Sequence, residues 1–146
     1  MKTTPPETLL GFDFGMKRIG VAIGQTVTKT ARPLGMIKAE QGRPQWEPIA
    51  KLIKTWQPDA LVVGIPLNMD GTEQPLTLAA QQFADLLQQR FNLPVFGMDE
   101  RLTSIEAKAR LFESGGYKAL QNTSIDSIAA QLILQNWLTQ SDHDET

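Results

Sequence analysis

The stretch from Thr8 to Ile23 reads TLLGFDFGMKRIGVAI, and it decides how the chain begins to fold. Apolar side chains alternate with other residues in both of its halves, which predicts strands over residues 8–14 and 18–23. Gly15, Met16 and Lys17 lie between them and form a glycine-containing turn of hairpin length. We therefore expect a hairpin that places Asp13 near the end of the first strand.

The rest of the chain predicts a mixed sheet covered by helices. A third strand is expected within residues 29–37, at a sheet edge because Pro33 cannot donate a ladder hydrogen bond. Residues 41–44 are expected to form a loop. The remaining pattern predicts strands over 60–65 and 94–98, and helices with Pro48 in the first turn, from Pro75, from Thr103 to Gly115, and from Thr123 or Ser124 to Gln140.

This order predicts an α/β protein with a five-stranded mixed sheet and helices on both faces. In the last helix, the predicted buried stripe is Ile125, Ile128, Ala129, Leu132, Ile133 and Trp137. The 146 residues are expected to form one domain, 1–146, with flexible ends at 1–7 and 141–146.

Composition excludes several kinds of catalytic site. The chain has no cysteine and a single histidine, His143, which excludes thiolate metal sites, cysteine nucleophiles and multi-histidine centres within one chain. Catalysis would have to use carboxylates, hydroxyls, lysines or arginines. The absence of a membrane-length apolar run and of a signal peptide's apolar core predicts a cytoplasmic protein with no membrane contact.

Charge is unevenly distributed along the chain. The formal net charge is −2, so a global basic signature for nucleic acid is missing. Residues 1–50 nevertheless carry seven Lys or Arg against four Asp or Glu. A local basic surface is therefore compatible with the sequence.

Carboxylates follow strands that are expected to end at the same edge of the sheet. Asp13 follows Phe12 in an apolar strand, where an unpaired charge is costly. Asp99 and Glu100 follow the last strand, and because side chains alternate, only one of them can face Asp13. Asp126 lies in the first turn of the final helix, whose packing would bring it to the same corner.

Three converging carboxylates repel one another unless a cation lies between them. Oxygen ligands suit Mg²⁺ or Mn²⁺, and two such ions about 4 Å apart would align a water and a leaving oxygen around a phosphodiester. The residues alone leave structural roles open. Glu100 could pair with Arg101 or Lys108 at the surface, and an acid at the position of Asp126 stabilises the helix dipole.

Four segments together resemble one known family. They are GFDFGMKRIGVA (11–22), VVGIPLNMDG (62–71), DERLTSIEA (99–107) and IDSIAA (125–130). In order and spacing they are similar to the bacterial YqgF/RuvX family, over roughly Leu9 to Leu138. The resemblance implies a ribonuclease H-like fold, a relationship to resolvases of the RuvC type, and a role in maturing the 5′ end of pre-16S ribosomal RNA.

The resemblance also implies which residues act. The acids of the family fall on Asp13, Glu100 and Asp126, as catalytic residues and ligands of one or two Mg²⁺ or Mn²⁺ ions. The expected reaction is hydrolysis of an RNA phosphodiester. Lys17, Arg18 and Arg101 are candidate phosphate clamps beside the acids; the alternative role is an ion pair with a neighbouring acid, or for Arg101 with the site acids themselves.

Two other functions remain open. A Holliday-junction endonuclease would act on branched DNA and would need a symmetric dimer. A non-catalytic module would bind RNA or a ribosomal particle without cleaving it. For the preferred nuclease, the expected partners are precursor rRNA and a ribosomal particle, with the chain as a monomer or weak homodimer.

Overall fold

Four strands are followed by alternating helices and strands in the computed structural model, which describes residues 7–99 and 125–140. The strands are β1 (Thr8–Asp13), β2 (Arg18–Gln25), β3 (Thr30–Glu40), β4 (Arg43–Pro44), β5 (Ala60–Ile65) and β6 (Val95–Asp99). The helices are α1 (Trp46–Trp56), α2 (Pro75–Phe91) and α5 (Ile125–Gln140). The helix predicted from Thr103 to Gly115 and the predicted cap at Thr123 or Ser124 lie outside the described residues.

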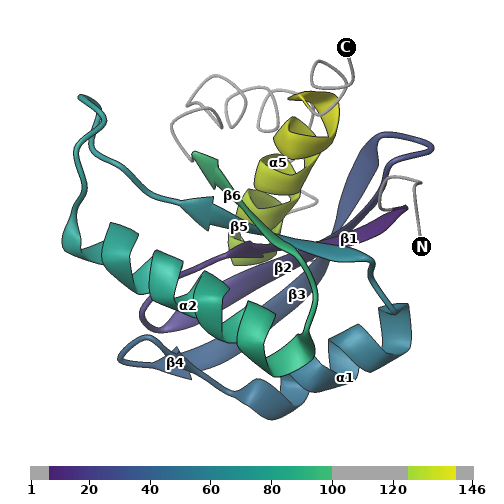
Figure 1. Ribbon diagram of the computed structural model, residues 1–146, viewed down its shortest axis with the longest axis horizontal. Coiled ribbons are helices and arrows are strands. Elements are labelled where there is room, and N and C mark those ends of the chain that lie inside the picture. The colour runs from purple at the N-terminus through teal and green to yellow at the C-terminus, as the bar shows by residue number, and fades with distance from the viewer. Residues whose placement is uncertain (1–6, 100–124, 141–146) are drawn as a thin grey trace.

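The strands form a mixed sheet in the order β4-β3-β2-β1-β5-β6 (Figure 1). β1 is antiparallel to β2 and parallel to β5, and β5 is parallel to β6. The carboxyl ends of β1, β5 and β6 therefore lie at one edge of the sheet. Ligands of α/β sheets bind at this kind of edge.

Five strands and a loop over 41–44 were predicted, and both predictions are wrong because the sheet has a sixth, short strand within that segment. Arg43 and Pro44 form the short strand β4, paired with Glu40 and Ala39 of β3. The chain reverses through Gln41 and Gly42, whose φ angles are 52° and 81°. Left-handed backbone at a non-glycine residue gives little sequence signal, so the turn was not recognised.

β3 is longer than predicted and runs on to Glu40. Pro33 lies opposite Ala22, next to a register shift between Val21 and Ala22. Among the described strands, only β4 borders the outer side of β3, and it does not reach Pro33. The predicted edge position of the third strand therefore holds at Pro33 and is wrong at Ala39 and Glu40, which pair with β4.

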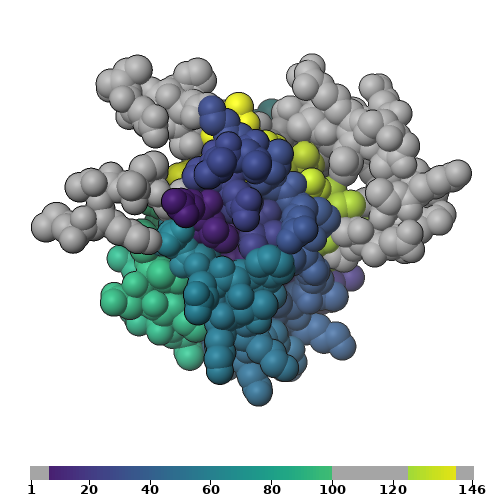
Figure 2. Space-filling model, turned by 90° about the vertical axis from the view of Figure 1, so that its right-hand side faces the viewer, coloured from purple at the N-terminus to yellow at the C-terminus, as the bar shows by residue number. Residues whose placement is uncertain are grey.

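The helices lie on both faces of the sheet, as predicted. α1 and α2 cover one face and α5 covers the other, and the side view shows α5 (yellow-green) across the strands from α1 and α2 (Figure 2). On the first face, Phe83 of α2 packs edge-on against Phe12, with ring centroids 5.6 Å apart. α2 begins with a capping box between Gln74 and Thr77.

Small residues form the floor under α5. A Cβ added at Gly11 would lie 2.8 Å from the Cβ of Leu134, and one at Gly24 would lie 2.9 Å from the side chains of Leu134 and Leu138. At Gly20, the added atom would overlap the backbone carbonyl of Asp126. The helix can therefore lie directly on the backbone of β1 and β2.

The predicted buried stripe of α5 is partly wrong. Ile125 is 71% exposed, whereas Ile128 and Ile133 are buried as predicted. The other buried apolar residues are Ala130, Leu134 and Leu138. Apolar residues occur almost all round this helix, so periodicity alone cannot predict its buried side. The buried side is set by the glycines of β1 and β2 on which the helix packs.

Polar contacts fix the rotation of α5 over the strands. The backbone N–H of Ala31 donates to Oε1 of Gln135 at 2.9 Å, and Nε2 of Gln131 donates to the Ala31 carbonyl at 2.9 Å. Both contacts hold the helix to β3. No helix among the described residues is long and apolar enough to cross a membrane.

We expect Gly20→Ala to destabilise the protein by about 2–3 kcal/mol or more, because the new methyl group must push α5 off the sheet. Gly97→Ala is the matched control. Its Cβ would contact Cγ1 and Cδ1 of Ile65, at 3.2 and 3.9 Å, and the expected cost is below about 1 kcal/mol. Urea unfolding of both variants measures the difference; equal stabilities would contradict the close approach at Gly20.

Candidate active site

Asp13 is the last residue of β1 and lies on the α5 face of the sheet. Side chains alternate along the strand: Leu10 and Phe12 belong to the core under α1 and α2, whereas Leu9 packs under α5. Asp13 follows the alternation of Leu9 and is half-buried. Its register partner on β2 is Gly20.

Asp126 reaches the same place from the opposite end of the chain. It lies in the first turn of α5, and its backbone carbonyl rests on Gly20. One glycine is thus both the strand partner of Asp13 and the residue under Asp126. The structure brings these two predicted site residues together.

Arg18 adds a positive charge to this corner. Its Nε lies 3.6 Å from Oδ2 of Asp126, with the two side chains 63% and 31% exposed. Because both side chains are accessible to solvent, this ion pair contributes at most about 1 kcal/mol, and Arg18 can readily exchange Asp126 for another partner. The pairing of Arg18 with a neighbouring acid, which the sequence left open, is therefore observed.

Lys17 lies in the turn between β1 and β2 with its side chain exposed. Its carbonyl accepts a 2.8 Å hydrogen bond from the backbone N–H of Ala39, and the carbonyl of Met16 accepts one of 2.9 Å from Gly42. These bonds fasten the β3–β4 turn to the β1–β2 turn. The lysine is thereby held next to Arg18 on a braced turn.

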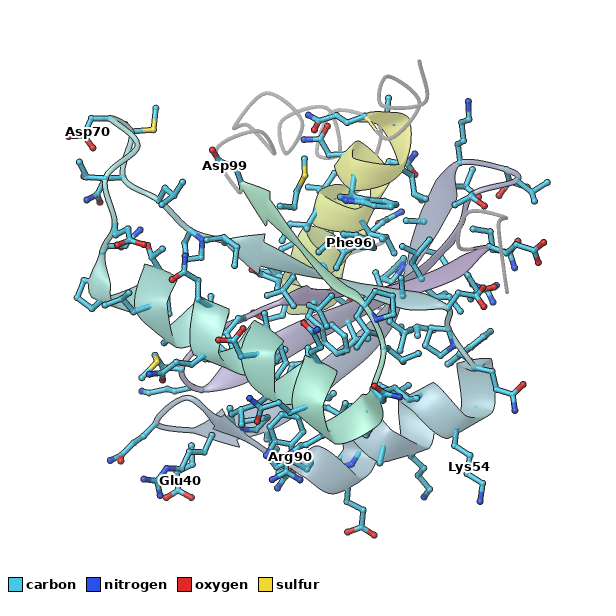
Figure 3. All side chains as sticks on the ribbon, in the orientation of Figure 1. Glu40, Lys54, Asp70, Arg90, Phe96 and Asp99 are labelled. Carbon is cyan, nitrogen blue, oxygen red and sulfur yellow. The ribbon has the colours of Figure 1, made fainter. Side chains whose placement is uncertain are left out.

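Asp99 lies at the end of β6, at the same edge of the sheet (Figure 3). The ring of Phe96 stacks on Trp137 of α5 at 5.3 Å, and Met98 packs in the α5 core. By alternation, Asp99 faces away from α5. Glu100 and Arg101 lie outside the described residues, and within 7–99 and 125–140 no three potential ligands cluster.

The sequence analysis missed the role of Gly20. The available signal was a set of small residues at alternate positions of β2, Gly20, Ala22 and Gly24, facing the same way as Gly11 of β1. Such a row indicates close approach of another element. Recognising it would have placed the final helix on that face.

The chain is similar to known proteins over most of its length. The family model described as "RuvX: Holliday junction resolvase" matches residues 7–140. The chain belongs to the RuvX family. A relative from Klebsiella pneumoniae is 56% identical over 92% of this chain and 97% of its own, and one from Actinobacillus pleuropneumoniae serotype 7 is 59% identical over 89% and 95%. Both bear the name "Putative pre-16S rRNA nuclease".

Solved structures share the fold of this RuvX protein at low sequence identity. Thermus thermophilus RuvC in complex with a Holliday junction matches with a TM-score of 0.56 and 14% identity, over 93% of this chain and 96% of RuvC. The fowlpox virus Holliday junction resolvase matches with a TM-score of 0.55 and 16% identity, over 92% and 98%. The expected family and ribonuclease H-like fold are confirmed.

We expect Asp126→Asn to leave the folded protein almost as stable as the wild type. The change removes an exposed ion pair and a favourable charge near a helix start, each worth at most about 1 kcal/mol, and keeps the backbone contact with Gly20. Urea unfolding checks this. A loss above about 3 kcal/mol would show that the carboxylate is a structural element.

Proposed function

We propose that this RuvX protein is a metal-dependent nuclease that hydrolyses an RNA phosphodiester during 5′-end processing of pre-16S rRNA. The observation that carries the proposal is the meeting of Asp13 and Asp126 over Gly20. The names of relatives sharing 56% and 59% of their residues with this chain support the substrate.

The donor chemistry of the corner fits a hard cation. Asp13 and Asp126 offer only carboxylate oxygens, which Mg²⁺ and Mn²⁺ prefer. When bound, one or two such ions would lower the pKa of a water and stabilise the charge on the phosphate oxygens. In our proposal Asp13 anchors the metal from the rigid sheet and Asp126 closes the site from the first turn of α5.

We take Glu100 as the third ligand in preference to Asp99. The basis is the alternation of β6, which turns Phe96 and Met98 toward α5 and Asp99 away from it. Asp13 lies on the α5 side. Glu100 follows Asp99 in the sequence and belongs to the resembling segment 99–107.

The neighbouring cations are proposed to hold the substrate. Arg18 lies 3.6 Å from Asp126 in a solvent-exposed pair, so it can leave the carboxylate and bind a phosphate when a cation takes its place. Lys17, on the same braced turn, would bind the phosphate backbone as a point charge. Arg101 is proposed as a third clamp on the basis of its position after Glu100 in the sequence.

The proposed setting follows from the proposed substrate. Precursor rRNA is processed in the cytoplasm within an assembling ribosomal particle, and a near-neutral chain with one basic region suits a substrate that the particle helps to hold. We propose a single domain over residues 1–146 that acts as a monomer or a weak homodimer.

The second candidate is a Holliday-junction endonuclease. The description of the matching family model favours it. Purified protein offered precursor rRNA and a four-way DNA junction under the same conditions separates the two functions. Preferential cutting of the junction, with symmetric incisions, would select the second.

We expect Asp13→Asn and Asp126→Asn each to reduce Mg²⁺-dependent cleavage of precursor rRNA more than about a hundredfold. Loss of residues that merely support a metal ligand already costs 10–100-fold, as an order of magnitude. Asp85→Asn, an exposed acid of α2 on the other face, is the matched control and should cleave like the wild type.

Chelation by EDTA should abolish cleavage, and added Mg²⁺ or Mn²⁺ should restore it. Unchanged Mg²⁺-dependent cleavage by folded Asp13→Asn protein would reject the assignment. Binding of RNA without cleavage by the wild type in either metal would instead support a non-catalytic RNA-binding module.

A further inference from the structure

A row of charged, mainly cationic side chains runs across β2, β3 and β4 from the acidic corner, which is the place where Asp13 and Asp126 meet. Arg18 at the start of β2 lies directly opposite Lys38 of β3, and Arg43 of β4 lies opposite Glu40 of β3. All four side chains are exposed. The row begins at the arginine that touches Asp126 and ends on the β3–β4 turn.

Register places the row on the same face of the sheet as Asp13. Ile19 and Ile37, the next pair after Arg18 and Lys38, point into the core under α1 and α2. Arg18 and Lys38 therefore point to the opposite side, which is the α5 side. Ala39 also packs toward α1 and α2, so Glu40 and its partner Arg43 continue the row.

The far end of the row borders a hollow. A surface pocket of about 590 Å³ is lined by Lys38, Ala39, Glu40, Gln41, Arg43, Pro44 and Gln45. Figure 3 shows Glu40 at this end, at the β3–β4 turn and far from Lys54 of α1. Two cations, one carboxylate and two amide side chains line the hollow, and the excess of positive charge suits an anionic, hydrogen-bonding ligand.

The charges of the row are not balanced within the described part of the protein. Lys17, Lys38 and Arg43 form no ion pair with a described carboxylate, and the four side chains of the row, Arg18, Lys38, Glu40 and Arg43, carry a formal charge of +2. Like charges directly opposite each other, as at Arg18 and Lys38, destabilise a sheet. A bound anion between them would relieve that repulsion.

We propose that Lys38 and Arg43 bind successive phosphates of the RNA strand being cleaved and lead that strand from the β3–β4 turn to the acidic corner. Neighbouring strands lie about 4.8 Å apart, so the row spans several strands and is longer than one phosphate. It passes from β2 through β3 to β4, which suits a sugar–phosphate backbone followed over more than one phosphate. The inference rests on the proposed nuclease function.

Backbone hydrogen bonds hold the β3–β4 turn against the β1–β2 turn. The Lys17–Ala39 and Met16–Gly42 backbone hydrogen bonds, 2.8 and 2.9 Å long, tie it to the turn that carries Arg18. Lys38 and Arg43 therefore keep a constant position relative to Asp126. Binding a phosphate there positions the chain of the substrate without reorganising the protein.

The test measures binding of a fluorescein-labelled single-stranded RNA, with the sequence of the precursor 5′ end, by anisotropy over a range of salt concentrations. All proteins carry Asp13→Asn to prevent cleavage. In single strands, each phosphate contact contributes about −0.7 to the slope of log K against log salt. The double variant Lys38→Gln/Arg43→Gln should bind more weakly, by roughly tenfold or more, with a slope less steep by about 1.4.

Three further variants separate a specific track from general charge. Lys51→Gln/Lys54→Gln removes the same charge from exposed positions of α1, on the other face, and should leave affinity and slope unchanged. Glu40→Gln removes the acid of the row and should tighten binding. Lys38→Gln should also raise the melting temperature of the free protein at low salt, because it removes the repulsion with Arg18.

The outcomes distinguish this inference from the proposed function. Equal losses in the Lys38/Arg43 and Lys51/Lys54 variants, or no binding of RNA by the parent protein, would overturn the track. A wild type that cleaves nothing while the track variants lose affinity as expected would reject the nuclease and retain the track. Tighter binding and a larger loss with a four-way DNA junction than with RNA would overturn the choice of RNA.

Discussion

The contact between α5 and the backbone of β2 at Gly20 is the constraint on which the site depends. Any side chain at this position would overlap the carbonyl of Asp126 and hold the helix away from the sheet. With glycine there, the first turn of α5 comes down beside the carboxyl end of β1, where Asp13 lies. Two acids far apart in sequence meet because one position lacks a side chain.

The two faces of the sheet differ in the size and charge of their side chains. Large aromatic side chains such as Phe12 and Phe83 pack in the hydrophobic core under α1 and α2. The α5 face is lined by small residues near Gly20 and by cations from Arg18 outward. A chain with a net charge of −2 can thereby present a basic surface exactly where a polyanion would meet the acids.

Much of this structure could be read from the sequence, because its strongest patterns are local. Alternation located β1 and β2, a third strand was expected within 29–37, and short apolar runs located β5 and β6. β4 was not predicted because the chain reverses at Gln41 in a left-handed conformation, which a non-glycine residue does not indicate in the sequence. The buried side of α5 was misjudged at Ile125 because a helix that is apolar all round takes its orientation from its partner. The pairing of Arg18 with Asp126 depends on that same long-range docking, so no local pattern could settle it.

The central claim is that Asp13 and Asp126 share a bound cation over Gly20. Anomalous X-ray diffraction from crystals soaked in Mn²⁺, recorded for the wild type and for Asp13→Asn protein, tests it most directly. We expect an anomalous peak within coordinating distance of both carboxylates in the wild type, and its loss in the variant. A manganese ion bound elsewhere, or one at this corner that touches neither carboxylate, would contradict the account.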